Sequence, residues 1–250
     1  MNSPTVLQVE NVSKIFGRAV AVDRLSCEVR GGELLGIIGP NGSGKTTLVN
    51  LITGFVKPTS GQIIYNGRDI TGAAPHKIVC MGISRTFQMV RPFYQLPAYK
   101  NMIIPLYSPR VRQQAGGRYG DRNAVALDLL EEVGFERDAH VAYKPAGTLP
   151  QGYLKRLELA KAIALSPDML ILDELFSGLS LAEVASVVPV IEKLRAAGKT
   201  IIMIEHRLKE LFRIADRIMV LNYGRKIAEG AAAEVMESDE VKKAYLGSEE

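Results

Sequence analysis

A glycine-rich segment near the N-terminus constrains this chain more than any other feature. Residues 39–47 read Gly-Pro-Asn-Gly-Ser-Gly-Lys-Thr-Thr and fit the pattern G-x-x-x-x-G-K-[ST]. They follow an apolar run, residues 34–38, and precede a stretch of helical character that begins near Lys45. In such a loop, backbone N–H groups turn inward around phosphate oxygens, and the helix presents the positive end of its dipole to the same anion. The sequence therefore predicts a nucleoside triphosphate site, and a purely structural glycine turn is the weaker interpretation.

Length and composition indicate a globular protein with a sizeable core. The chain has 250 residues, of which 47% are hydrophobic. It has no apolar run near the roughly 18 residues of a membrane-spanning helix, and its first residues lack the features of a signal peptide. We therefore expect a cytosolic protein. Cys27 and Cys80 are too few for a disulfide framework or a zinc site, and we expect both to be buried packing residues.

Charge is distributed unevenly, although the formal net charge is only +4. Between Ile70 and Gly120 there is no Asp or Glu, whereas seven Lys or Arg residues and six aromatic residues occur there. This acid-free stretch fits a surface for an anionic partner, either lipid headgroups or nucleic acid. It also fits a protein interface rich in Tyr and Arg, or a solvated basic face.

Hydrophobic patterning predicts strands that alternate with helices around the phosphate-binding segment. Strands are expected at residues 7–12, 19–29, 33–38, 62–65, 83–87, 169–172, 199–204 and 217–221, with a hairpin turn at 222–225. Helices are expected at residues 45–53, 123–133 and 182–196, and from Pro75, Gly152 and Arg207 onward. This alternation implies an α/β fold with a mainly parallel sheet covered on both faces. Strand signals fade between residues 91 and 165, which indicates an inserted helical lobe.

Two carboxylates follow an apolar strand, residues 169–172. Hydrolysis of a bound triphosphate needs a magnesium ion, charge stabilisation and a positioned water. Lys45 is expected to place its charge at the β and γ phosphates, and Thr46 to offer its hydroxyl to magnesium. Asp173 is expected on the metal side, and Glu174 to orient and deprotonate the water. Loop capping by Asp173 and simple solvation of Glu174 are the alternatives, but the end of a buried strand is where open α/β sheets bind ligands.

Two more polar residues end predicted strands. His206 follows the apolar run 200–204 and Glu205, and we expect it to contact the γ-phosphate. Gln88 closes the strand that begins at Ile83 and opens the helical lobe, so it is placed to report γ-phosphate occupancy to that lobe.

Taken together, these motifs resemble the ATP-binding subunit of ATP-binding-cassette (ABC) transporters over nearly the whole chain. The resemblance makes Phe16 the aromatic that stacks on adenine, Gln88 the lobe-coupling glutamine, Asp173 the magnesium aspartate, Glu174 the catalytic glutamate and His206 the switch histidine. Residues 149–153 lie where the family has its signature, with Gly152 as the clearest retained element. The nucleotide-binding residues implied by the resemblance are Phe16, Gly39, Asn41, Gly42, Ser43, Gly44, Lys45, Thr46, Thr47 and Gly152. The implied magnesium-binding residues are Thr46, Gln88 and Asp173. The implied catalytic residues are Gln88, Glu174 and His206.

The resemblance also implies an organisation and a set of cofactors. It implies a P-loop NTPase core with an N-terminal antiparallel β-subdomain at residues 1–90 and 166–230, an inserted α-helical subdomain at 91–165 and a helical tail at 231–250. ATP and Mg²⁺ are the implied cofactors.

Four segments, residues 51–55, 82–88, 204–208 and 244–247, resemble the branched-chain amino-acid uptake ATPases within that family. They imply a subunit that pairs with a second ABC ATPase, identical or different. It would power two transmembrane permease subunits at the cytoplasmic face of the cell membrane, with a substrate-binding protein involved indirectly and no nucleic acid. Cargo would be branched-chain or other hydrophobic amino acids.

The chain departs from the family pattern at the signature, where Pro150, Gln151 and Tyr153 replace the usual residues, and at Leu175 and Ser180. We hypothesise that the composite site built from this signature is the less active of two. Three alternatives stay open: an ABC ATPase that serves a soluble partner, as in iron–sulfur assembly, one that serves another transported substrate, and a nucleotide sensor without hydrolysis.

Overall fold

The computed structural model describes residues 3–114, 120–136 and 140–246. The chain divides into two compact units: the first comprises Met1–Ile78 and Gly198–Glu250, and the second comprises Val79–Ala197. The subdomain boundaries expected near residues 90 and 165 mark the helical insertion and differ from the limits of these compact units. They remain a prediction.

An antiparallel sheet begins the first unit. It contains β1 (Thr5–Phe16), β2 (Ala19–Arg30), β4 (Ser60–Tyr65) and β5 (Arg68–Asp69) in the order β2-β1-β4-β5. Leu7 is fully buried and pairs with Val29 on one side and Tyr65 on the other. The alternation of apolar residues along β1 therefore places one face of this sheet in the core.

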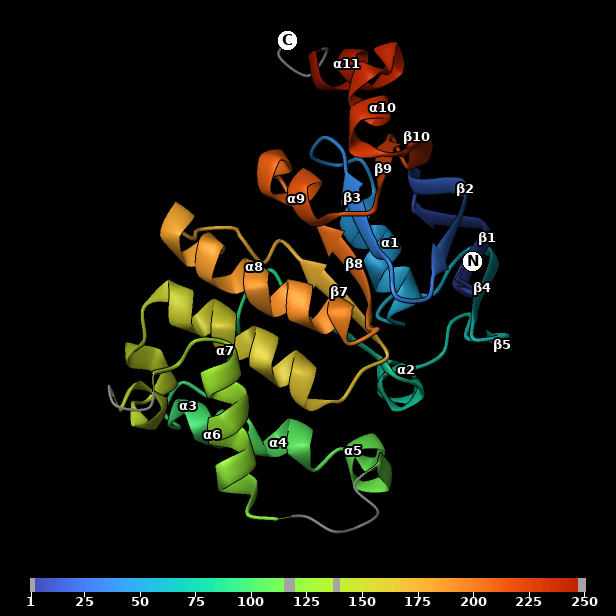
Figure 1. Cartoon of the computed structure of the whole chain (residues 1–250). Helices are drawn as coiled ribbons and strands as arrows, with labels where there is room; N and C mark the ends of the chain where they lie inside the picture. The colour runs from blue at the N-terminus through green and yellow to red at the C-terminus, as the bar shows by residue number, and fades with distance from the viewer. Residues whose placement is uncertain (1–2, 115–119, 137–139, 247–250) are drawn as a thin grey trace. The chain divides into compact units, whose positions relative to one another are not determined.

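Parallel strands form the second part of the first unit. Strand β3 (Leu34–Ile38) pairs in parallel with β8 (Thr200–Ile204) and β9 (Arg217–Asn222), while β10 (Arg225–Gly230) returns antiparallel to β9 (Figure 1). Every residue of β3 and β8 is buried, as expected for strands covered on both faces. Helices α1 (Lys45–Ile52), α9 (Leu208–Ile214), α10 (Ala232–Glu237) and α11 (Asp239–Leu246) belong to this unit, and α2 (Pro75–Met81) crosses its boundary.

The second unit combines a parallel strand pair with helices. Strand β6 (Ile83–Arg85) pairs with β7 (Met169–Asp173), so that Arg85 lies opposite Ile171. The helices are α3 (Ala98–Asn101), α4 (Ile103–Leu106), α5 (Pro109–Gln114), α6 (Arg122–Glu132), α7 (Gln151–Ala164) and α8 (Leu181–Ala196), with short 3₁₀ turns at Val141–Tyr143 and Ala146–Thr148. Helices α3, α4 and α7 all contact α6 (Figure 1).

These elements confirm the predicted α/β class with mainly parallel strands, an N-terminal antiparallel sheet and a helical insertion. The predicted strands and long helices are present with small shifts at their ends. Within the described ranges, none of the helices combines the length and the apolar character needed to cross a membrane.

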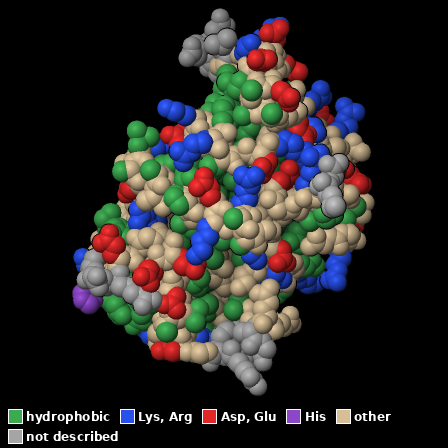
Figure 2. Space-filling view, in the orientation of Figure 1, with side chains coloured by type: hydrophobic (Ala, Val, Ile, Leu, Met, Phe, Trp, Pro, Cys, Tyr) green, Lys and Arg blue, Asp and Glu red, His purple; other side chains and the backbone are tan. Residues whose placement is uncertain are grey.

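The acid-free stretch is not a uniform basic surface. The buried Arg85 guanidinium donates from Nη2 to Asp173 Oδ2 at 2.8 Å, and Arg110 Nη2 lies 2.7 Å from Asp168 Oδ2. Two of its cations are therefore paired with carboxylates from elsewhere in the second unit. On the face drawn in Figure 2, Lys and Arg side chains are interspersed with Asp and Glu. Arg118 and Tyr119, also in this stretch, lie outside the described residues.

The two cysteines differ in environment. Cys27, in β2, is buried, whereas Cys80, in α2, is exposed, so the expectation that both are packing residues is wrong for Cys80. The buried residue of α2 is Ile78, and two positions along a helix correspond to a rotation of about 200°. Cys80 therefore faces away from the core.

This contrast predicts selective thiol chemistry. Burial raises the pKa of the Cys27 thiol to about 12, and only the thiolate reacts. The raised pKa means that the folded chain favours the neutral thiol. The contribution of Cys27 to folding stability is therefore present below the unfolded pKa near 9.0 and is lost as pH rises towards 12. We expect iodoacetamide at pH 8 to modify Cys80 in the folded protein and both thiols in guanidinium chloride, as read by peptide mass spectrometry. Equal modification of Cys27 in the folded protein would contradict this.

Candidate active site

Backbone carbonyls of neighbouring strands pack against the phosphate loop, residues 39–47, at two positions where only glycine fits; we call this close packing the clamp. At Gly39 φ is +150°, and a Cβ there would lie 2.1 Å from the carbonyl oxygen of Leu221 at the end of β9. At Gly44 φ is +104°, and a Cβ would lie 2.6 Å from the carbonyl oxygen of Ala21 in β2. Backbone from two strands thus approaches the loop too closely for any side chain at these positions.

Lys45 places a buried ammonium inside the loop. Its Nζ donates to the carbonyl oxygens of Gly39 at 2.7 Å and Pro40 at 2.8 Å, and to Ser43 Oγ at 3.3 Å. Helix α1 begins at Lys45, so Thr46 and Thr47 lie in its first turn. Backbone N–H groups in a first helical turn have no partner within the helix, and the helix dipole is positive there. The loop therefore joins a cation and a helix N-terminus at one place, as an anion site requires.

Phe16 ends a strand that pairs with β2, and His206 follows a strand that lies beside β3. Phe16 ends β1 with 49% of its surface exposed, and it pairs with Ala19 at the start of β2, the strand that contacts Gly44. His206 is exposed and follows β8, which lies beside β3. Because parallel strands end at the same edge of a sheet, His206 and the phosphate loop leave the sheet at that edge.

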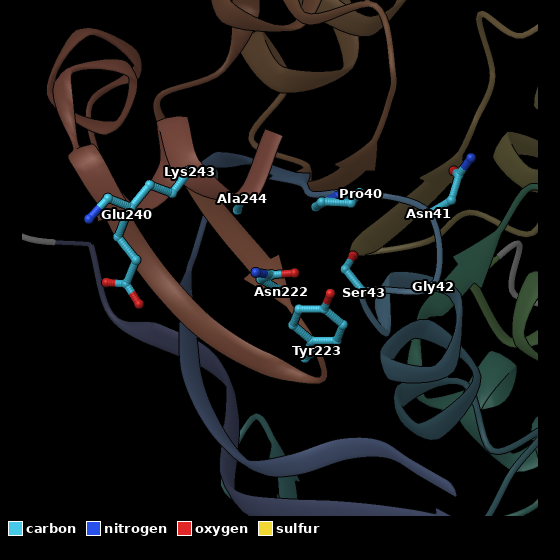
Figure 3. A pocket seen from close by; sticks show the side chains of 9 residues that line it. All are labelled: Pro40, Asn41, Gly42, Ser43, Asn222, Tyr223, Glu240, Lys243 and Ala244. Atoms are coloured by element: carbon cyan, nitrogen blue, oxygen red, sulfur yellow. The ribbon is translucent and has the colours of Figure 1, made fainter. Parts of the chain in front are cut away.

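Helix α11 also reaches the phosphate loop, which the motifs did not indicate. A cavity of about 310 Å³ is lined by Pro40, Asn41, Gly42 and Ser43 of the loop, by Asn222 and Tyr223 of the β9–β10 turn, and by Glu240, Lys243 and Ala244 of α11 (Figure 3). Burial raises the pKa of Tyr245, while a hydrogen bond with the Gly39 backbone acts in the opposite direction. The end of the described chain therefore touches the first glycine of the loop.

In the second unit, a buried carboxylate ends β7. Asp173 is 2% exposed, its backbone N–H donates to Thr86 Oγ1 at 3.1 Å, and its Oδ2 accepts from Arg85. Burial raises the pKa of Asp173 above its usual value, although the Arg85 guanidinium lowers it. In the sequence, Arg85 is one cation of the acid-free stretch and part of the segment 82–88, and neither pattern marks it as a site residue. The parallel pairing of β6 with β7 is the signal that would have located it beside Asp173.

Glu174 and Gln88 are joined directly. Gln88 Nε2 donates to Glu174 Oε2 at 2.6 Å. Glu174 has a φ of +49°, a left-handed conformation that is uncommon for a residue with a side chain. Lys155, which no motif marks as a site residue, is 3% exposed and donates from Nζ to the carbonyl oxygens of Gln88 and Glu174. Gln88, Asp173 and Glu174 therefore form one cluster with two cations that no motif identified.

Gly152 is buried at the start of α7, where a Cβ would lie 1.9 Å from Glu183 Oε1. Glu183 belongs to a capping box: Ser180 Oγ accepts from the Glu183 N–H, and the Glu183 carboxylate accepts from the Ser180 N–H at 2.7 Å. Hydrogen bonds with Ser180 lower the pKa of Glu183. Ser180, one of the departures from the family pattern, thus caps α8.

Tyr153, another departure, packs within its own unit. Its ring centroid lies 5.0 Å from that of Phe135 in an edge-on arrangement, and the Arg156 guanidinium lies 5.4 Å from the Tyr153 ring centroid.

The predicted site residues fall in both units. The first unit contains Phe16, Gly39, Asn41, Gly42, Ser43, Gly44, Lys45, Thr46, Thr47 and His206, and the second contains Gln88, Gly152, Asp173 and Glu174. In the first set, residues 39–47 follow β3, His206 follows β8 beside it, and Phe16 ends β1, whereas Gln88, Asp173 and Glu174 gather around the end of β7.

Comparison with known proteins agrees with this geometry. Residues 22–177 match the family described as ABC transporter, and residues 225–250 match the family described as branched-chain amino acid ATP-binding cassette transporter. The chain is 36% identical to the high-affinity branched-chain amino acid transport ATP-binding protein BraF of Pseudomonas aeruginosa, over 98% of this chain and 99% of the relative.

Solved structures show the same similarity. A nucleotide-free ATP-binding cassette from an ABC transporter superposes with a TM-score of 0.86 at 30% identity, covering 97% of this chain and 99% of the other. An ATP-binding cassette of an ABC transporter in its ADP conformation superposes with a TM-score of 0.84 at 32% identity, covering 98% and 100%.

The chain therefore belongs to the ABC transporter family. It is an ATP-binding, ATP-hydrolysing transporter subunit with the fold of an ABC cassette.

The clamp on Gly39 gives a direct prediction. Gly39→Ala adds a Cβ against the Leu221 carbonyl, so we expect ATP affinity to fall at least about tenfold. Gly67→Ala is the matched control, because Gly67 also has a positive φ, of +73°, but a Cβ there meets nothing within 4 Å. Titration with a fluorescent ATP analogue would compare the variants, with thermal unfolding to confirm folding. Equal ATP affinity in the two variants would show that the close approach of the Leu221 carbonyl to residue 39 is not needed for nucleotide binding.

Proposed function

We propose that this subunit hydrolyses Mg-ATP with Glu174 as the catalytic base and powers import of branched-chain or other hydrophobic amino acids. The observation that carries the catalytic assignment is the Gln88–Asp173–Glu174 cluster at the end of β7, in which Gln88 orients the Glu174 carboxylate through a hydrogen bond of 2.6 Å. A carboxylate oxygen accepts a hydrogen bond from water and can take its proton, as a general base requires. Lys45 and the first turn of α1 hold the phosphates, His206 contacts the γ-phosphate, and Phe16 stacks on adenine.

The residues assigned to magnesium have suitable chemistry. Mg²⁺ prefers oxygen ligands and is usually held by one or two protein groups together with substrate phosphates. Thr46 offers a hydroxyl in the first turn of α1, Asp173 a buried carboxylate, and Gln88 an amide oxygen, since its nitrogen is engaged with Glu174. Burial makes the Asp173 charge costly, as its raised pKa indicates, so a nearby cation would stabilise the carboxylate. When bound, magnesium supplies charge neutralisation at the phosphates.

The cargo assignment rests on relatives. The relative of Pseudomonas aeruginosa is named for branched-chain amino acid transport, and the family that matches residues 225–250 carries the same description. In such a system, this chain would pair with a second ABC ATPase, act on two permease subunits at the cytoplasmic face of the membrane, and never touch the cargo.

A run of exposed apolar residues supports docking of a permease to the second unit. Phe87, Met89, Phe93, Tyr94 and Leu96 are each between 38% and 67% exposed, and Arg91 lies among them in the sequence. Clustered exposed aromatic residues beside an arginine are typical of protein interfaces. We assign this segment, residues 87–96, as the contact with the permease.

The proposed function predicts two linked results in transporters reconstituted into vesicles. Binding proteins loaded with branched-chain amino acids are expected to stimulate ATP turnover, and Glu174→Gln is expected to lower kcat about 100-fold or more while ATP still binds. A cargo panel read by phosphate release would identify the amino acid. Stimulation by an unrelated solute alone would overturn the cargo assignment, and near-normal turnover in Glu174→Gln would overturn the catalytic one.

The docking assignment predicts a separation of coupling from nucleotide affinity. Arg91→Glu reverses a charge within the 87–96 segment, so we expect the transport rate to fall several-fold while KM for ATP changes by less than about twofold. Arg68→Glu, an exposed reversal in β5 of the first unit, is the control and should leave transport unchanged. Transport would be measured as the initial rate of cargo uptake, with the rate of ATP hydrolysis and its KM recorded in parallel. An unchanged rate in Arg91→Glu would remove this segment from the interface.

A further inference from the structure

Lys155 is a buried cation that joins two distant parts of the second unit. Its Nζ donates to the Gln88 carbonyl oxygen at 2.9 Å and to the Glu174 carbonyl oxygen at 3.1 Å. The residue is 3% exposed and projects from α7. A buried ammonium is costly unless its donors are satisfied, so these bonds fix both the lysine and the two carbonyls.

The two carbonyls belong to the residues whose side chains meet. Gln88 Nε2 donates to Glu174 Oε2, so the side-chain bond and the two Lys155 bonds close a ring through both main chains. Glu174 also has a left-handed backbone, with φ of +49°, which the surrounding structure has to maintain. The Glu174 carbonyl accepts from Lys155 Nζ and, at 3.2 Å, from the Ser177 N–H, so the Lys155 bond joins a local turn in fixing the peptide group that directly follows Glu174.

Lys161, on the same helix, shows how Lys155 differs from an ordinary helical lysine. Lys161 Nζ lies 2.9 Å from Glu158 Oε2, three residues earlier, and its side chain is 23% exposed. Such local pairs on a helix contribute little and link no separate segments. Lys155 instead bonds residues that are 67 and 19 positions away in the sequence.

We propose that Lys155 is a positioning residue for ATP hydrolysis: it holds the main chains of Gln88 and Glu174 so that Gln88 keeps the Glu174 carboxylate aimed at the attacking water. This inference rests on the proposed role of Glu174. Lys155 touches neither nucleotide nor water in this scheme, and it acts through the two residues whose carbonyls it binds. Its replacement therefore alters the rate of hydrolysis rather than the binding of ATP.

Steady-state hydrolysis by the reconstituted transporter tests the proposal. Lys155→Met removes the ammonium at similar length, and we expect kcat to fall about 10- to 100-fold, with KM for Mg-ATP within about twofold. Lys155→Arg keeps the charge and donors and is expected to recover most of the loss. Lys161→Met is the control, and its kcat should equal that of the unsubstituted protein. Rates are normalised to the folded, ATP-binding fraction, measured with a fluorescent ATP analogue, so that a loss of folding is not counted.

A double-mutant cycle separates positioning from a merely structural role. If Lys155 acts through Glu174, then Lys155→Met adds no further loss to the residual rate of Glu174→Gln. Three outcomes would each overturn the proposal. The losses of kcat in Lys155→Met and Glu174→Gln could multiply in the double variant, Lys155→Met and Lys155→Arg could lose kcat equally, or Lys155→Met could have an unchanged kcat. A normal Lys155→Met beside an inactive Glu174→Gln overturns this inference alone, whereas an active Glu174→Gln overturns the proposed function and this inference with it.

Discussion

The close approach of backbone to backbone at Gly39 is the constraint on which the nucleotide site depends. The carbonyl of Leu221, at the end of β9, lies where a side chain of residue 39 would stand. Because β9 and β3 are neighbours in the buried parallel sheet, this contact follows from the sheet itself. The packing of strands therefore sets the position of the loop, and the loop carbonyls and Ser43 Oγ then hold the Lys45 ammonium.

Two buried cations in the second unit fix the segment that carries Asp173 and Glu174. Arg85 faces the Asp173 side chain, and Lys155 binds the main chain beside Glu174. Each removes a different cost of placing acidic residues at the end of a buried strand: the first balances charge, and the second satisfies carbonyls around an uncommon backbone conformation. A cluster of this kind has little freedom to rearrange, because every member is bonded to a partner on another segment.

Much of this structure follows from local sequence patterns. Buried strands such as residues 34–38 and 200–204 are short apolar runs, and the phosphate loop is defined by residues adjacent in the sequence. Helices α3, α4 and α5 were not predicted individually, because each is at most six residues long and prolines lie at or beside them. Arg85, Lys155 and Tyr245 were missed as site residues for another reason. Their partners are far away in the sequence, and only the pairing of β6 with β7 and the packing of α7 and α11 bring them together.

The position of β3 has a consequence for how the chain matures during translation. Its hydrogen-bonding neighbours, β8 and β9, and the helix that carries Tyr245 all lie after residue 199, more than 150 residues beyond the loop. Since a ribosome releases the N-terminal part first, the loop that carries Lys45 emerges long before the strands that enclose it. A nascent chain halted before residue 217 lacks the backbone that clamps Gly39. The capacity to hold a nucleotide should therefore arise only after residue 221 has left the ribosome.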